Sequence, residues 1–264
     1  MQNNKKIELT VFDWAGTVTD YGGVAPLIVF NETLSGYGVK LTKQEINKPM
    51  GMEKKDHIRA LLQTEKANGQ WRERYGREWT EEDVNQIYLK FESTLFSIVA
   101  DYSIVIPGVA ETVEALKKQG IHIGSTTGYT SEMMKNVLPK AKQGGYEPEC
   151  VVTPDLVGSG RPAPFMIYEN MRKFGVYPPK HVVKVGDTVM DVLEGVNAGA
   201  WSVGVLEGSN QVGLSREEAQ ALPAEEMKDL KLNAAKAYLA AGADFVIDSI
   251  TQLPSIIEII NSRL

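Results

Sequence analysis

Acidic residues follow two of the apolar runs that the sequence predicts to be strands. Asp13 ends the run IELTVFD, whereas Asp187 ends VVKVGD and is followed four residues later by Asp191. Ligands of open parallel sheets bind outside the carboxyl ends of the strands, so these three carboxylates can meet there. Carboxylates around one point repel each other unless a cation lies between them, and oxygen ligands with room for water and a phosphate oxygen suit Mg²⁺. The alternative is that Asp191 only caps the following helix, whose N-terminus favours acids.

Two further motifs beside predicted strand ends could bind a phosphoryl group. Thr126, Thr127 and Gly128 lie between a strand and a helix that begins near Ser131. Hydroxyl and backbone N–H groups at such a junction can hold phosphate oxygens. Arg161, in GSGRPAP, could pair bidentately with the same group. Each motif also has a simpler explanation, since threonines commonly cap helices and arginines in loops are often solvated.

Composition narrows the class of protein. The chain of 264 residues has a net charge of −6, which argues against a broad surface for nucleic acids. No apolar run approaches the ~20 residues that span a bilayer, and the N-terminal MQNNKKIELTVFD lacks the separate apolar stretch of a signal peptide. The single cysteine, Cys150, excludes an intramolecular disulfide. We therefore expect a cytoplasmic protein that binds neither membranes nor nucleic acids.

Short apolar runs alternate with amphipathic segments over most of the chain, which is the pattern of a parallel α/β sheet. The expected strands span residues 7–13, 121–126, 150–153, 182–187, 201–206 and 243–248. The expected helices of the same region span residues 108–119, 131–140, 163–174, 188–198, 226–241 and 251–262.

Residues 21–104 break this alternation. They contain helical patterns at 25–37, 42–47, 54–66 and 80–99, without a convincing strand. A helical block inserted after the first strand predicts a cap domain over the carboxyl edge of the sheet. We therefore expect a core of residues 1–20 and 105–264 and a cap of residues 21–104, with hinges near 20–24 and 101–107. The tract 207–225 is rich in Gly, Ser and Glu and predicts a surface loop with a short helix, whose role the sequence does not indicate.

The order of these motifs resembles the haloacid dehalogenase superfamily: a first-strand aspartate, a threonine, a basic residue before a proline and a pair of acids. The resemblance implies a Rossmann-like core with an inserted helical cap. It makes Asp13 a nucleophile that takes up a phosphoryl group as an aspartyl phosphate. It also assigns the Mg²⁺ ligands, namely Asp13, the Ala15 carbonyl and Asp187, supported by Asp191. The implied ligands of the transferring group are Thr127 or its neighbour Thr126, Gly128 and Arg161.

Ala15 departs from most phosphatases of that superfamily, which carry a second aspartate two residues after the nucleophile. That aspartate protonates the leaving group, and such acid catalysis contributes ~10²–10⁴-fold to the rate. The predicted cap offers another group, because the helix after NKPMGM carries Lys54, Lys55 and His57. Adjacent helical residues point about 100° apart, so only one lysine can face a given site. The simpler explanation is that both lysines lie on a solvated surface.

DWAGT, KPMG, KxDH and GSTTGYT together resemble the phosphonoacetaldehyde hydrolase family within the superfamily. The resemblance implies that Lys54 forms a Schiff base with the substrate aldehyde, so that the P–C bond breaks without an acid at position 15. It implies that Met50, His57 and Tyr129 line the site and that the protein is a homodimer acting in phosphonate degradation. His57 is a proton shuttle or only a hydrogen-bonded helix residue. At Gly23 the chain lacks the cysteine of some members.

Two other functions remain open from the sequence. One is a phosphomonoesterase or phosphomutase of the same superfamily, which Ala15 disfavours. The other is an inactive protein that binds a phosphorylated metabolite or partner, which the retention of Asp13, Arg161, Asp187 and Asp191 disfavours.

Overall fold

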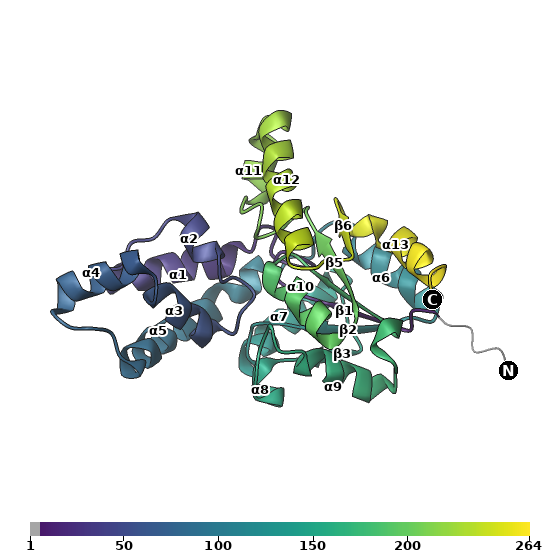
Figure 1. The fold of residues 1–264 in the computed structure, drawn as a ribbon, viewed down its shortest axis with the longest axis horizontal. Helices are drawn as coiled ribbons and strands as arrows, with labels where there is room; N and C mark the ends of the chain where they lie inside the picture. The colour runs from purple at the N-terminus through teal and green to yellow at the C-terminus, as the bar shows by residue number, and fades with distance from the viewer. Residues whose placement is uncertain (1–5) are drawn as a thin grey trace.

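A computed structural model describes residues 6–264, so the polar start of the chain lies outside the described residues. Six parallel strands form one sheet in the order β3-β2-β1-β4-β5-β6, and helices cover both of its faces (Figure 1). All six expected strands are confirmed: β1 (Leu9–Phe12), β2 (His122–Thr126), β3 (Cys150–Val152), β4 (Val182–Gly186), β5 (Trp201–Val205) and β6 (Phe245–Ile247). Within residues 6–264, the chain forms no helix of the length and apolar character needed to cross a membrane.

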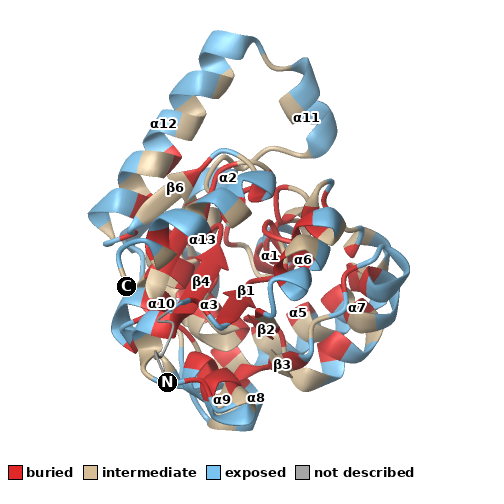
Figure 2. Cartoon of the chain, turned by 90° about the vertical axis from the view of Figure 1, so that its right-hand side faces the viewer, coloured by how far each residue is buried: buried red, intermediate tan, exposed pale blue. Residues whose placement is uncertain are grey.

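The strands lack polar alternation because the sheet is covered on both faces. β1 and β4 are buried along their whole lengths, as expected for a parallel sheet between helices (Figure 2). The helices of this region are α6 (Val109–Lys118), α7 (Ser131–Gln143), α8 (Pro154–Val157), α9 (Phe165–Phe174), α10 (Val189–Ala198), α11 (Arg216–Ala221), α12 (Ala224–Ala240) and α13 (Leu253–Asn261). The expected short helix in the tract 207–225 is α11, which with α12 projects away from the sheet (Figure 1).

Five helices separate β1 from α6 and form a block beside the sheet, so the α/β fold with an inserted helical block is confirmed (Figure 1). Their bounds are α1 (Val24–Gly36), α2 (Lys43–Asn47), α3 (Lys54–Leu62), α4 (Glu65–Tyr75) and α5 (Glu81–Tyr102).

The expected helix at 54–66 is wrong at its C-terminal end. α3 ends at Leu62. Thr64 then caps the separate helix α4, because its side chain accepts a hydrogen bond from the backbone amide of Ala67. Sequence reasoning missed α4 because only Ala67 and Trp71 of this polar helix are buried, too few to give a periodic signal.

The two connections between the helical block and the sheet lie side by side. Thr19 forms isolated β-bridges with Ala15 and with Val105, and the Ile106 amide donates to the Val18 carbonyl at 2.9 Å. The first connection turns sharply through two glycines with positive φ, Gly22 and Gly23. The chain therefore leaves and re-enters the sheet region at one place, which is where the sequence predicts hinges.

Candidate active site

Adjacent strands bring the acidic residues together. β1 and β4 are paired with Phe12 opposite Val185, and the Asp13 amide donates to the Val185 carbonyl at 2.9 Å. Asp13 and Asp187 therefore follow neighbouring strand ends. Together with Asp191 from the first turn of α10, they offer buried carboxylate oxygens that all lie within 4.8 Å of one another.

Electrostatics separates two of these acids from the third. Burial raises the pKa of Asp13, although Arg161 opposes the shift. Burial, together with repulsion by Asp13 and Asp191, raises the pKa of Asp187 well above its ordinary value. Burial acts on Asp191 as well, but Arg161 and Lys184 outweigh it and lower the pKa of Asp191. Two buried, mutually repelling carboxylates and the nearby Ala15 carbonyl form an oxygen donor set that fits Mg²⁺.

Asp191 serves two structural purposes. Its Oδ2 accepts the Thr188 amide at 3.2 Å and so caps α10, which was the simpler explanation of this residue. Its Oδ1 lies 3.0 Å from Arg161 Nη1 and 2.9 Å from Lys184 Nζ. Asp191 is therefore both a helix cap and a charge partner beside the two other acids.

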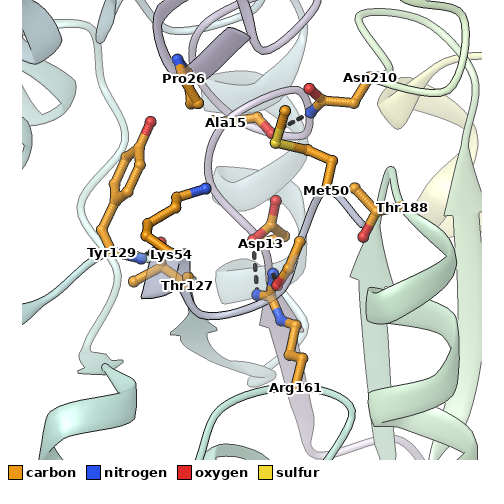
Figure 3. Close-up of a pocket in the computed structure, with 12 residues that line it drawn as sticks. Asp13, Ala15, Pro26, Met50, Lys54, Thr127, Tyr129, Arg161, Thr188 and Asn210 are labelled. Atoms are coloured by element: carbon orange, nitrogen blue, oxygen red, sulfur yellow. Dashed lines mark hydrogen bonds and ion pairs between the residues drawn. The ribbon is translucent and has the colours of Figure 1, made fainter. Parts of the chain in front are cut away.

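Arg161 is buried rather than solvated. Its Nη2 lies 2.6 Å from Asp13 Oδ1 (Figure 3). Its Nε lies 2.9 Å from Glu194 Oε2. Burial disfavours the charged form, but Asp13, Asp191 and Glu194 outweigh it and raise the pKa of Arg161. The guanidinium is thus held charged directly beside the carboxylate that ends β1.

The two threonines at the end of β2 have different surroundings. Thr126 Oγ1 donates to Glu194 at 3.0 Å and accepts hydrogen bonds from Arg161 and Lys184, both at 2.9 Å. Thr127 and Gly128 instead line a cavity that also contacts Asp13 and Arg161. Thr126 is therefore part of the network beneath the cavity, and Thr127 faces it.

Sequence reasoning missed Lys184, Glu194, Thr17 and Asn210. The sequence could have indicated Lys184, because a charged residue inside the apolar run of β4 is unusual. It could also have indicated Glu194, which lies three residues after Asp191 on α10. Thr17 Oγ1 donates to Asp187 at 2.8 Å, and Asn210 contacts Asp187 from the tract 207–225. Nothing in their local sequence indicates these two contacts.

The helical block contributes a second group to the cavity. Lys54, the first residue of α3, is 5% exposed, and its Nζ lies over the rings of Tyr129 (5.3 Å to the centroid) and Phe30 (5.8 Å). It lines the same cavity as Asp13, and both side chains point into it (Figure 3). Among the described residues, Lys54 forms no ion pair. Burial lowers its pKa to about 8, although Asp13 opposes the shift.

The segment between α2 and α3 closes the cavity. Met50 and Gly51 line it, and the Gly51 carbonyl lies 3.5 Å from Arg161 Nη1. A side chain on Gly128 would come within 2.7 Å of the Met52 carbonyl, so this segment packs directly against the end of β2. The cavity has a volume of about 20 Å³, which is room for a water molecule.

His57 lies behind Lys54 rather than in the cavity. Its Nε2 donates to the Ile46 carbonyl at 2.8 Å, and its ring packs against Phe30 at a centroid distance of 4.0 Å. Burial and the charge of Lys54 lower the pKa of His57 well below its ordinary value, so the imidazole is neutral. The buried residues of α3 are Lys54, His57, Ile58, Leu61 and Leu62.

Comparisons with known proteins identify the family of the chain. The family model described as haloacid dehalogenase-like hydrolase matches residues 7–199. The chain is 49% identical over 260 residues to the phosphonoacetaldehyde hydrolase of Bacteroides fragilis, covering 98% of this chain and 99% of that protein. It is 47% identical to the bifunctional phosphonoacetaldehyde hydrolase/aminoethylphosphonate transaminase of Clostridioides difficile, of which it covers 40%.

A solved structure is similar over nearly the whole chain. It is that of a phosphonoacetaldehyde hydrolase-like protein from Oleispira antarctica, with a TM-score of 0.95 and 37% identity over 98% of this chain and 94% of that one. The chain belongs to the phosphonoacetaldehyde hydrolase family of haloacid dehalogenase-like hydrolases.

Proposed function

We propose that this enzyme hydrolyses the P–C bond of phosphonoacetaldehyde to acetaldehyde and phosphate. The observation that carries the proposal is one buried cavity lined by both Asp13 and Lys54, with Ala15 where an acid would otherwise stand. The names of the relatives support the substrate. The reaction of a phosphomonoesterase or a phosphomutase does not require a buried lysine with a lowered pKa at this place.

Lys54 carries out the first half of the reaction. Its uncharged amine adds to the aldehyde carbon, and uptake of one proton with loss of water leaves a protonated imine. A pKa of about 8 leaves a substantial fraction of the amine unprotonated near neutral pH. The rings of Tyr129 and Phe30 keep water from the amine. Neutral His57, three residues further along α3, is proposed as a group that moves a proton during condensation.

Asp13 carries out the second half. Its carboxylate attacks phosphorus, the P–C bond breaks, and the bonding electrons pass into the protonated imine, which becomes an enamine. Because carbon leaves with its electrons accepted by the imine, no acid is needed at position 15. Arg161, Thr127 and Gly128 are proposed to bind the phosphoryl oxygens, and Thr126 to hold Arg161 from below.

Asp13, the Ala15 carbonyl and Asp187 are proposed to hold Mg²⁺, with Asp191 supporting them. A bound Mg²⁺ supplies positive charge that offsets the repulsion between the carboxylates and the phosphonate. Water then hydrolyses the aspartyl phosphate. Protonation of the enamine and hydrolysis of the resulting imine release acetaldehyde and restore Lys54.

Asp13 and Lys54 are both buried, so a substrate needs an opening to reach them. We propose that residues 21–104 form a cap that opens for substrate and closes to exclude water, with hinges near 20–24 and 101–107. The transaminase joined to the Clostridioides difficile relative supports a supply of the aldehyde from 2-aminoethylphosphonate. A cytoplasmic location stays a prediction. A homodimer also remains a prediction.

Reductive trapping tests the proposal. Borohydride added with phosphonoacetaldehyde should attach a two-carbon or phosphonoethyl adduct to Lys54, identified by peptide mass spectrometry. Lys54→Ala should abolish both the adduct and phosphate release. Lys55→Ala, on the adjacent position of α3, is the matched control and should retain both. Full activity of Lys54→Ala would exclude the mechanism, and turnover of sugar phosphates without trapping would favour a phosphatase.

A further inference from the structure

The tract 207–225, whose role the sequence does not indicate, returns to the active site through Asn210. This side chain is 3% exposed, and its Nδ2 donates to the Ala15 carbonyl at 3.1 Å (Figure 3). The same Nδ2 donates to Asp187 Oδ2 at 2.7 Å. Its backbone amide also donates to Asp187 Oδ2, at 2.8 Å. One residue therefore contacts two of the three groups proposed to hold Mg²⁺.

Asn210 also contacts the helical block. Its backbone carbonyl accepts a hydrogen bond at 3.1 Å from the side chain of Asn47, the last residue of α2. A second link lies nearby, where Lys43 at the start of α2 pairs with Glu218 of α11 at 3.0 Å. The tract therefore joins the groups at the ends of β1 and β4 to the block that supplies Lys54.

The remaining side-chain atom of Asn210 faces the first connection. Its Oδ1 is buried and has no hydrogen-bond partner among the described residues. A Cβ on Gly23 would collide with this oxygen, so position 23 has no space for a side chain. Gly23 has a φ of 58°, which also favours glycine. Asn210 and Gly23 therefore depend on each other sterically.

We propose that Asn210 is a positioning residue that holds the Ala15 carbonyl and the Asp187 carboxylate in place for Mg²⁺ and connects them to closure of the cap through Asn47. The inference rests on the proposed function in that it assumes the Mg²⁺ site. An amide suits this place because its N–H groups satisfy two oxygens without adding a further negative charge to the carboxylates. Groups that orient metal ligands in this way typically change metal affinity 10–100-fold when removed.

Titration calorimetry with Mg²⁺ alone tests whether Asn210 positions the Mg²⁺ ligands. The titration uses the full chain without substrate. Asn210→Ala should weaken Mg²⁺ binding at least about tenfold. Asn47→Ala is the matched control: it removes the contact with the helical block and leaves the contacts with Ala15 and Asp187, so its Mg²⁺ affinity should stay within about twofold of the parent. Unchanged Mg²⁺ binding by folded Asn210→Ala overturns the inference. If that variant does not fold, Asn210→Ser carries the same test.

Steady-state kinetics tests whether Asn210 connects the Mg²⁺ ligands to closure of the cap through Asn47. Asn47→Ala should raise KM for phosphonoacetaldehyde by about two- to tenfold, the range for one lost hydrogen bond, with Mg²⁺ saturating and kcat little changed. An unchanged KM overturns the link to the cap. Gly23→Ala should weaken Mg²⁺ binding in the parent but much less in Asn210→Ala, because the colliding oxygen is absent there. Equal effects in both backgrounds contradict the steric dependence.

The two proposals can fail separately. Mg²⁺ binding is measured without substrate, so the absence of phosphate release from phosphonoacetaldehyde would reject the proposed function alone. Equal Mg²⁺ affinities of Asn210→Ala and Asn47→Ala would reject the role of Asn210 alone.

Discussion

Two buried lysines on opposite sides of the active site have opposite surroundings. Lys184, on β4, lies 2.9 Å from Thr126 Oγ1, 2.9 Å from Asp191 and 3.2 Å from Glu194. Lys54, on α3, lies over aromatic rings, and among the described residues no acid is within ion-pair distance of it. The network around Lys184 thus pairs its positive charge with two acids, whereas among the described residues Lys54 has no acidic partner.

The difference in surroundings sets the charge state that each functional group needs. Arg161 and Asp191 must remain charged, and a hydrogen-bonded network of opposite charges keeps them so. Lys54 must lose its proton to react with an aldehyde, and burial without a partner favours the uncharged amine. An unpaired buried amine costs folding free energy, which is a common trade between stability and function.

The largest expected effect is on phosphate release, and it distinguishes the role of Asp13 from that of Lys54. Asp13→Asn should lower phosphate release roughly 10⁴- to 10⁶-fold, because the nucleophile is lost. Borohydride trapping at Lys54 should persist, because imine formation occurs on the other side of the cavity. Phosphate assay and peptide mass spectrometry on one preparation measure both. Loss of trapping in Asp13→Asn would show that Asp13 also takes part in condensation.

Lys184→Met should lower the free energy of unfolding by about 3–5 kcal/mol, since it leaves buried Asp191 and Glu194 without one of their partners. Urea denaturation followed by circular dichroism measures the change. Lys118→Met is the surface control, because Lys118 forms only an exposed pair with Glu114, and should change stability by less than about 0.5 kcal/mol. A change in Lys184→Met as small as in this control would contradict the compensated network.

Lys54→Met should act in the opposite direction and stabilise the fold while abolishing activity. The pKa of Lys54 falls from 10.5 to about 8 on folding, so the charged amine costs on the order of 3 kcal/mol at pH 7. The cost is full below pH 8 and disappears as the pH rises toward 10.5. The stability advantage of the variant in urea denaturation should follow the same pH window. A destabilised Lys54→Met, with Lys55→Met unchanged, would refute the comparison.

The pH dependence of kcat/KM is the smallest expected effect. Because the free amine reacts, kcat/KM should rise about tenfold per pH unit below pH 8 and level off above it. Lys184→Met should keep the same break, since Lys184 does not lie in the cavity. A break near the ordinary lysine value of 10.5 would mean that burial does not activate Lys54.

Much of the fold could be predicted because its signals are local. Each strand is a short apolar run, and the absence of such runs between Asp13 and Val105 indicates the helical insertion. α4 was missed for the complementary reason. Its polar sequence buries only Ala67 and Trp71, so contacts with the other helices hold it rather than a periodic pattern.

The sequence by itself determined which residues follow the strands, that Ala15 replaces an acid, and that Lys54 and His57 lie on one helix after NKPMGM. Those features depend on residue type and on spacing of a few residues. The tertiary structure decided which threonine faces the cavity, that burial lowers the pKa of Lys54, and that Asn210 reaches Ala15, 195 residues away in the chain. Burial and charge partners arise from contacts between distant segments, and no local pattern encodes them.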